Sequence, residues 1–283
     1  MKNVLIIAVS VVLSVVITTT FFGGSETQII KTKESVFDRV MRTGKIRCGY
    51  NTEPPMLDID PNTGEVFGAT VDIVERIGKL MSLDIEWSEQ VSWTDMPAGL
   101  EADRYDLVCN GKWIFAAQSR GAEFSPPIYY TAVHAYGRDS ENRLDDQLSN
   151  LNNKDFSVTS MDGEINFFIA HDKFPNAQKL EYPALTSTAE LILAVLNKKA
   201  DVTFLAAFTG NDYIEKNPGK IKQLTKDPIV VFDTALMYKS GESAFGGMLD
   251  AAIRQMHSDG FINESLDKYN VSPQETIRVP KPY

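Results

Sequence analysis

Apolar residues recur along the chain with two spacings, and segments of the two kinds alternate. Residues 71–81 repeat apolar side chains at helical intervals, and residues 83–91 then alternate apolar and polar positions as a strand does. Residues 94–102 again favour a helix, and residues 105–110 form an apolar run typical of a buried strand. This order predicts a mostly parallel sheet with helices on both faces.

The same alternation begins earlier in the chain and starts again after residue 155. Residues 34–43 predict a short helix that ends near Gly44, and residues 45–50 predict a buried strand. The second series comprises a strand at 156–160, helices at 164–171 and 187–197, and a strand at 201–205. The chain of 283 residues is long enough for two cores. The sequence therefore predicts two similar α/β lobes.

Two extended stretches, residues 129–136 and 229–238, can each cross from one lobe to the other. The helices predicted at 244–257 and 261–269 then return to the first lobe. The expected fold is thus two Rossmann-like lobes joined by a two-strand hinge, which opens and closes around a cleft. The predicted division is 34–132 plus 236–283 for lobe one and 133–235 for lobe two.

The N-terminal segment predicts export. Residues 4–22 are almost wholly apolar, follow Lys2 and precede a Gly-Gly-Ser break. No cysteine follows the apolar run, which argues against a lipid anchor, and the run is about long enough to span a membrane. Residues 1–24 are either a signal peptide that is removed or an anchor that is retained. The body of the protein is expected in the periplasm or otherwise outside the cytoplasm.

The charge of the chain argues against a nucleic-acid partner. The formal net charge is -10, and the lysines and arginines are scattered among acidic residues. Binding to a polyanion needs clustered cations that displace phosphate counterions.

The sequence offers no metal site and no cofactor site, and it does not favour an enzyme. His134, His171 and His257 are isolated, and no nucleophile has a neighbouring base. Asp58 and Asp60 resemble the start of a calcium loop, but the Pro-Asn-Thr-Gly that follows predicts the turn of a hairpin between 56–60 and 66–69.

Two cysteines, Cys48 and Cys109, fall on strands that are predicted to be neighbours. Two buried free thiols are the favoured interpretation. An exported compartment also permits a disulfide, which requires Cα atoms within about 7 Å of each other.

Five modest motifs carry a resemblance to a known family. They are, in order, GKIRCGYNTEPPM, VFGATVDIVERIGKLM, WTDMPAGLEADRYDLV, SRGAEFSPPIYY and DAAIRQMHSDGFINESLDKYN. In this order and spacing, residues 34–271 resemble the family 3 extracellular solute-binding proteins, the amino-acid receptors of ABC transporters. The resemblance implies the type II periplasmic binding fold, a monomer, a small carboxylate ligand and a transporter permease as partner.

The resemblance also implies ligand-binding residues in the first lobe. Arg120 is expected to grip the ligand's carboxylate, because a guanidinium donates two parallel hydrogen bonds; a salt bridge is the alternative. Asn110 and Gly111 are expected to contact the ligand from a loop that also holds Trp113 and Phe115. These two aromatic residues either line the cleft or pack in the core.

Further candidates lie at the end of the first strand and in the second lobe. Tyr50 and Glu53 are expected to face the cleft. The family's Gly-Thr-Thr turn corresponds to Met161–Glu164, where Asp162 and Glu164 replace the hydroxyls and Gly163 offers backbone amides. Asp162 is alternatively a helix N-cap.

One departure bears on the ligand. The aspartate that binds the ammonium group in the family corresponds to Ala206 here. Burying an ammonium without a carboxylate is costly. Either Asp162 or Glu164 replaces the aspartate, or the ligand is not an ordinary α-amino acid. Two other functions remain open, a dehydratase-like enzyme that uses a cleft carboxyl such as Glu53, and a membrane-anchored sensory module.

Overall fold

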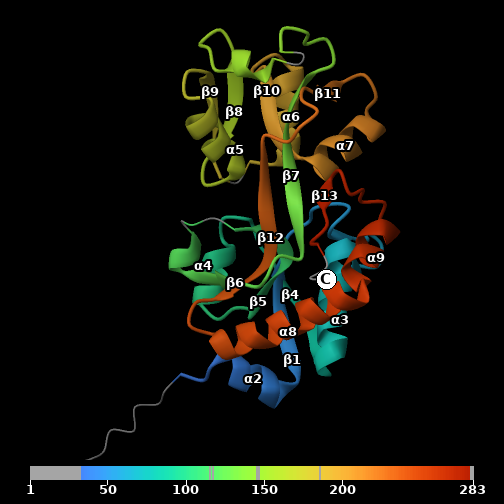
Figure 1. Cartoon of the computed structure of the whole chain (residues 1–283). Coiled ribbons are helices and arrows are strands. Elements are labelled where there is room, and N and C mark those ends of the chain that lie inside the picture. The colour runs from blue at the N-terminus through green and yellow to red at the C-terminus, as the bar shows by residue number, and fades with distance from the viewer. Residues whose placement is uncertain (1–32, 115, 117, 145–146, 185, 281–283) are drawn as a thin grey trace, which may run out of the picture. The chain divides into compact units, whose positions relative to one another are not determined.

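The structure is a computed structural model that describes residues 33–280, apart from 115, 117, 145–146 and 185. In this part of the chain, one sheet runs through both lobes (Figure 1). From one edge to the other its strands are β4 (Asp84–Gln90), β1 (Lys45–Tyr50), β5 (Leu107–Trp113), β12 (Val230–Lys239), β7 (Tyr129–Arg138), β10 (Val202–Ala206), β8 (Ser157–Met161) and β9 (Gln178–Tyr182). Strands β4, β1 and β5 are parallel to one another, as are β10, β8 and β9. Each lobe therefore contributes a set of parallel strands, as predicted, but the two sets belong to one sheet.

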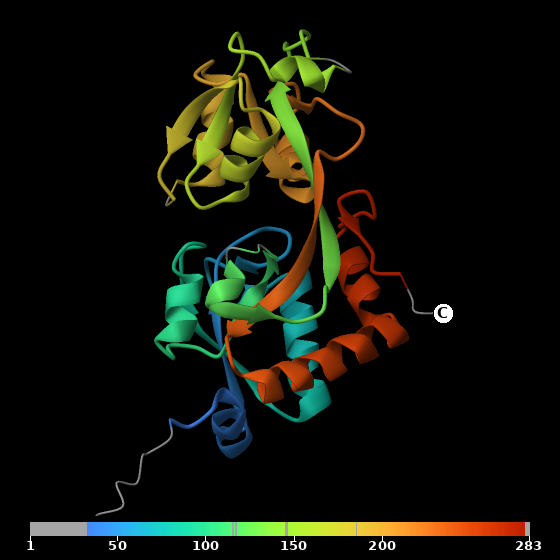
Figure 2. The same ribbon diagram turned by 60° about the vertical axis from the view of Figure 1, so that its left-hand side comes forward.

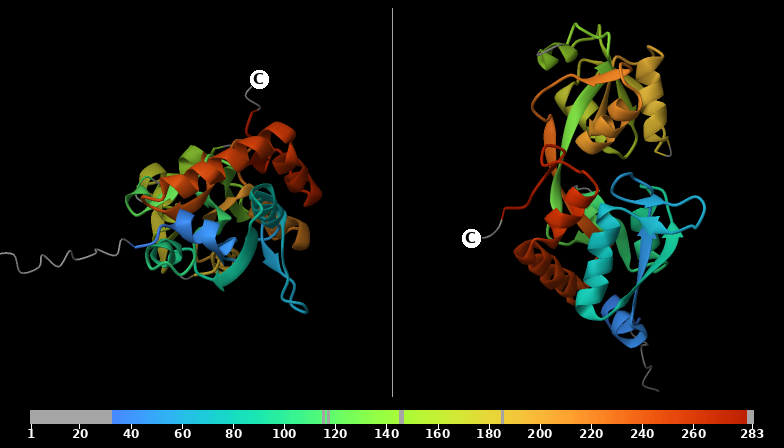
Figure 3. Two further views of the ribbon diagram at one scale, coloured as in Figure 1. Left: turned by 90° about the horizontal axis from the view of Figure 1, so that it is seen from below. Right: turned by 90° about the vertical axis from the view of Figure 1, so that its right-hand side faces the viewer.

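The first lobe has helices on both faces of its strands. Its helices are α2 (Val36–Thr43), α3 (Ala69–Met81), α4 (Met96–Glu101), α8 (Ser243–Asp259) and α9 (Phe261–Lys268). Side chains on β5 alternate between two cores, so that Leu107 and Cys109 pack with α3 and α8, and Val108 packs with α4. Figure 3 shows α8 and α9 beside α3. The C-terminal helices therefore return to the first lobe, as predicted.

The second lobe repeats this plan. Its helices are α5 (Ile165–Phe168), which a π-helical turn at Ile169–Lys173 continues, α6 (Thr188–Leu196) and α7 (Ala207–Lys216). On β10, Val202 and Phe204 pack with the α5 side, and Leu205 packs with the α6 side. Ser187 and Glu190 form a reciprocal capping box that fixes the start of α6.

The hinge consists of the two long strands β7 and β12, which Figure 2 shows crossing between the lobes. Strand β7 continues into the second lobe beside β10, and β12 continues into the first lobe beside β5. At the centre, the hydroxyls of Thr131 and Thr234 lie 2.7 Å apart. A short strand that was not predicted, β13 (Thr276–Ile277), pairs with β7 at Thr131. The predicted lobe boundaries fall within β7 and β12.

Smaller elements complete the fold. They are the hairpin of β2 (Asp58–Ile59) and β3 (Val66–Phe67), the edge strands β6 (Ala122–Phe124) and β11 (Ile221–Gln223), and the 3-10 turns η1 (Gln118–Arg120) and η2 (Leu148–Leu151). In the hairpin turn, the carboxylate of Asp60 accepts hydrogen bonds from the backbone amides of Asn62 and Thr63. Asp60 therefore caps a turn, as the sequence pattern suggested.

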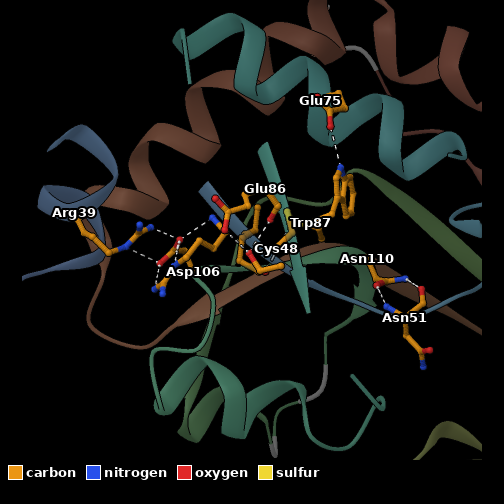
Figure 4. Close-up of a disulfide and its surroundings, with 12 residues drawn as sticks. Arg39, Cys48, Asn51, Glu75, Glu86, Trp87, Asp106 and Asn110 are labelled. Atoms are coloured by element: carbon orange, nitrogen blue, oxygen red, sulfur yellow. Dashed lines mark hydrogen bonds and ion pairs between the residues drawn. A yellow bond between two sulfur atoms is a disulfide. The ribbon is translucent and has the colours of Figure 1, made fainter. Parts of the chain in front are cut away.

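The two cysteines form a disulfide (Figure 4). Strands β1 and β5 are adjacent and parallel, which brings the Cα atoms of Cys48 and Cys109 to 5.4 Å from each other. The favoured expectation of free thiols is wrong, because the two buried side chains face each other across neighbouring strands. The predicted strand order is confirmed.

Within residues 33–280, leaving aside the gaps given above, no helix is long and apolar enough to cross a membrane. The predicted export segment at residues 4–22 lies outside the described residues.

Candidate functional site

A buried amide ties together the ends of the first lobe's inner strands. Asn110 on β5 accepts a hydrogen bond from the backbone N–H of Asn51 at 2.8 Å and donates one to the Asn51 carbonyl at 2.9 Å (Figure 4). This pair fixes the chain just after β1, two residues before Glu53. Asn110 was expected to contact a ligand. Each end of its amide makes one hydrogen bond to Asn51, so Asn110 positions the neighbouring segment, and its contact with a ligand stays a prediction.

A cavity of about 600 Å³, open solvent space included, lies between the lobes. The first lobe lines it with Glu53, Trp93, Gly111, Lys112 and Trp113. The second lobe lines it with Met161, Glu164, Ile165, Asn166, Thr188, Phe204, Leu205, Ala206 and Thr209. The walls are mainly apolar and carry a few charged groups, which is typical of small-molecule sites.

Lys112 brings a positive charge into this cavity from β5. Its side chain is 5% exposed, and its backbone pairs with Ala235 of β12. The ammonium lies 3.9 Å from a carboxylate oxygen of Glu164 and 5.0 Å from the ring centre of Trp93. A buried ammonium needs such partners. Since Glu164 belongs to the second lobe, this ion pair spans the cavity.

Two carboxyl groups share the single ammonium. Burial raises the pKa of Glu53 to about 8, against the opposing effect of Lys112, and the charge of Glu164 adds to the rise. Burial also raises the pKa of Glu164, again against the effect of Lys112. The cavity therefore holds groups that can bind both a carboxylate and an ammonium.

The second-lobe turn brings one of its predicted residues to the cavity. Strand β8 ends at Met161, Gly163 adopts a left-handed φ of 73°, and Glu164 occupies the N-cap position of α5 with extended backbone. Asp162 and Gly163 are exposed and lie outside the residues that line the cavity. The alternative expectation of Asp162 as N-cap is wrong, because the helix begins two residues later than that interpretation requires.

Arg120, the most important predicted residue, lies elsewhere. It ends the exposed 3-10 turn η1 and lines none of the described cavities. Its guanidinium is exposed, and its contact with the ligand's carboxylate stays a prediction. Lys112 is the cation that the described residues bring to the cavity between the lobes.

Of the other first-lobe candidates, one lines the cavity, one packs away from it, and one lies outside the described residues. Trp113 stacks on Phe232 with ring centres 5.5 Å apart and also lines the cavity, so it combines both of its expected roles. Tyr50 packs edge-on against Trp87, away from the cavity residues. Phe115 lies outside the described residues.

Gly111 is required by packing. A Cβ there would meet the hydroxyl of Tyr129 and would lie 2.7 Å from the methyl group of Thr234. The glycine thus allows β5 to approach the hinge strands closely. The predicted loop after Asn110 is in fact the end of β5, because β12 continues the pairing as far as Trp113.

Sequence reasoning missed Lys112, Trp93 and Asn166. The signal for Lys112 was available, since it is the lone charge in the run LVCNGKWIF. The Oδ1 atom of Asn166 is buried without a hydrogen-bond partner in the described structure, which suits a ligand donor. Ala206 ends β10 at the cavity, so the position predicted for the missing aspartate does line the site.

The described residues contain no group of three or more histidine, cysteine, aspartate or glutamate side chains placed to hold a metal ion. Among the described residues that line the cavity, the ionisable ones are Lys112, Glu53 and Glu164.

Comparison with known proteins gives two similar curated sequences. A Haemophilus influenzae protein described as a probable amino-acid ABC transporter-binding protein is 22% identical over 81% of this chain and 86% of its own length. The ABC transporter glutamine-binding protein GlnH of Bacillus subtilis is 24% identical over 84% of this chain and 86% of its own.

A similar solved structure is that of the ancestral amino acid-binding protein AncCDT-1, a precursor of cyclohexadienyl dehydratase. It superposes with a TM-score of 0.72 at 18% identity, over 83% of this chain and 99% of that one. The family model of the bacterial extracellular solute-binding proteins, family 3, matches residues 46–272. The two-lobed fold, the strand order and this match agree, and the chain belongs to the family 3 extracellular solute-binding proteins.

Proposed function

We propose that this protein captures a small amino acid outside the cytoplasm and delivers it to an ABC transporter permease. The observation that carries the proposal is the ion pair between Lys112 and Glu164, which spans the cavity from one lobe to the other. The curated relatives named above as binding proteins of amino-acid transporters support it.

The charges of the site match those of a zwitterion. At 3.9 Å, the ammonium of Lys112 and the carboxylate of Glu164 attract each other without a close hydrogen bond. An amino acid that enters between them places its carboxylate on Lys112 and its ammonium on Glu164. Both charges then keep an opposite charge nearby, so the polar groups stay paired while the ligand loses water. Glu164 thereby replaces the aspartate that is absent at Ala206.

Binding of this kind closes the hinge. A ligand that is held from both lobes stabilises the closed arrangement over the open one, and its differential affinity sets the shift. Strands β7 and β12 absorb the motion. The lobes that move are residues 34–132 with 236–283, and residues 133–235.

The experiment is a thermal-shift screen of amino acids, keto acids and other small carboxylates, followed by calorimetric titration of the best ligand. A ligand at a hundred times its dissociation constant adds about 2.7 kcal/mol of stability. Lys112→Met keeps an unbranched side chain, shorter only by the terminal nitrogen, and removes the charge. We expect it to weaken binding by about 2 to 5 kcal/mol, since it leaves a carboxylate buried without a partner.

Arg120→Ala is the matched control and is expected to bind as the parent does, because it removes an exposed cation of the same lobe. An unfolding curve for each variant checks its fold. Loss of binding in Arg120→Ala together with full binding in Lys112→Met would restore the role first expected of Arg120. A screen without zwitterionic hits would refute the amino-acid assignment.

A dehydratase-like activity is the second candidate, and one observation favours it. Burial holds the pKa of Glu53 at about 8, so this carboxyl is protonated at neutral pH and has a proton to donate. We nevertheless propose that the protein is not an enzyme, because the curated relatives are described as binding proteins of transporters. Incubation with carbocyclic acids tests this, and turnover that disappears in Glu53→Gln would contradict it.

The proposal includes export through residues 1–24, as a cleaved signal peptide or a retained anchor, and a monomer in solution. The mass of the mature protein from its native cell distinguishes cleavage from retention.

A further inference from the structure

The cavity holds more acidic than basic groups. Among its described lining residues, Lys112 is the one cation, and it faces the two carboxyls of Glu53 and Glu164. A zwitterionic ligand offers one negative and one positive group, which pair with Lys112 and with one carboxyl. The second carboxyl is left over, so the site has room for a second positive charge.

Glu53 is placed to receive that charge. Its backbone is held twice, by the Asn51–Asn110 pair two residues earlier and by hydrogen bonds with Leu57, from Glu53 N to Leu57 O at 2.7 Å and from Leu57 N to Glu53 O at 3.1 Å. In the described part of the chain, no side chain forms a hydrogen bond or a salt bridge with its carboxylate, although the charges of Lys112 and Glu164 act on it. A rigid backbone thus presents an acid without a direct partner.

The position of Glu53 is suited to contact the ligand's side chain rather than its α-amino and α-carboxylate groups. Glu53 lines both the central cavity and an outer cavity of about 940 Å³, open solvent space included. The two cavities share Trp93, Met161, Thr188 and Thr209 as well, so they adjoin each other. A ligand whose head lies between Lys112 and Glu164 therefore extends past Glu53 toward the hydroxyl-rich outer cavity.

Resting on the proposed function, we propose that Glu53 binds a positive charge on the ligand's side chain, so that the site prefers amino acids that carry an amine or a guanidinium there. The aromatic ring of Trp93, which already lies over the ammonium of Lys112, provides a second surface that attracts cations.

This preference is coupled to a proton. The groups that face Glu53 are Lys112 from β5, Glu164 from the second-lobe turn and Tyr129 from β7, whose own pKa is raised by burial and by the charge of Glu53. Burial keeps Glu53 protonated at neutral pH, because its pKa is about 8. A ligand cation favours the ionised form, so its binding releases the proton. A ligand with a neutral side chain leaves the proton in place.

The test compares lysine with norleucine, which has the same chain length and lacks only the side-chain amine. Titration calorimetry on the full protein, in two buffers of different ionisation enthalpy, gives the affinity and the number of protons released. We expect lysine to bind at least about tenfold more tightly than norleucine, a difference of about 1.4 kcal/mol, and to release up to one proton. Norleucine should release none.

Glu53→Gln should abolish both the preference for lysine over norleucine and the proton release. Equal binding of lysine and norleucine by the parent overturns the inference and leaves the proposed function standing. No binding of any amino acid overturns both. The comparison of the two ligands on the parent protein does not depend on how a variant folds, and Glu53→Asp, which shortens the acid by one methylene, is a second variant that should weaken lysine alone.

Discussion

The inner strands of the two lobes, β5 and β10, begin alike and end differently. Each is preceded by an aspartate that binds two arginines. Asp106 accepts hydrogen bonds from Arg39 and Arg47 before β5, and Asp201 accepts them from Arg138 and Arg143 before β10. Each aspartate also accepts a backbone N–H from the adjacent strand, from β1 at 2.7 Å and from β8 at 3.0 Å.

At their other ends the two strands diverge. Strand β5 runs on through Lys112 and Trp113 into the cavity, whereas β10 stops at Ala206, and the charge of the second lobe comes from Glu164 in a turn. The aspartate–arginine clusters that stabilise each lobe thus lie at the amino ends of β5 and β10, and they are similar in the two lobes. The carboxyl ends lead to the cavity, where open α/β sheets bind their ligands, and they differ.

The largest expected effect concerns a feature that the first lobe alone has, the disulfide between β1 and β5. Replacing Cys48 and Cys109 together by alanine removes a cross-link over 61 residues, which should lower the free energy of unfolding by about 4 kcal/mol. All three tryptophans, Trp87, Trp93 and Trp113, belong to the first lobe. Their fluorescence therefore follows the lobe that loses the bond.

Denaturant unfolding of the parent with and without reductant is the control for that experiment. A loss below about 1 kcal/mol would show that the other contacts of the first lobe suffice without the bond.

The next effect compares the two aspartates directly. The side chain of Asp106 is wholly buried, and that of Asp201 is 17% exposed. Asp106→Asn should cost about 3 kcal/mol, because it leaves two arginines against a neutral group. Asp201→Asn should cost less, about 1 to 2 kcal/mol, since water reaches its site and screens the charges. Chemical denaturation measures both losses of stability. Equal losses would mean that the deeper burial of Asp106 does not make its ion pairs contribute more than those of Asp201.

A smaller effect is the pH dependence that Glu53 gives to the empty protein. Its pKa rises from 4.5 in the unfolded chain to about 8 in the fold. Between these values the folded state binds more protons than the unfolded state, so stability falls as the pH rises. Because Glu53 is partly accessible to solvent, we expect the loss to be about 1 to 2 kcal/mol. Glu53→Gln should flatten this part of the stability profile, and an unchanged slope would contradict the raised pKa.

Local patterns predicted the fold well, because each element carries its own signal. Strand β1 has the predicted bounds, the helix of residues 187–197 is α6 with its capping box, and both hinge strands cross as expected. The exceptions arise from tertiary contacts. Strand β5 extends beyond its apolar run because β12 pairs with its polar end. Strand β13 forms because Thr276 and Ile277 pair with β7 at the hinge.

The site was harder to predict than the fold. Glu53, Gly111, Trp113 and Glu164 do line the cavity, and their contact with a ligand stays a prediction. Arg120 was chosen by its place in a motif; it lies outside the described cavities, and its contact with a ligand also stays a prediction. Lys112 was overlooked, although a lone charge in a buried strand requires a partner and so indicates a site.

The central claim is that Lys112 binds the ligand's carboxylate. A double-mutant cycle between protein and ligand tests it most directly, with calorimetric titration of the best amino acid and of its α-amide against the parent and Lys112→Met. We predict that the amide weakens binding strongly to the parent and hardly at all to the variant, which gives a coupling energy of about 2 kcal/mol or more. Additive losses, with a coupling below about 0.5 kcal/mol, would contradict the account.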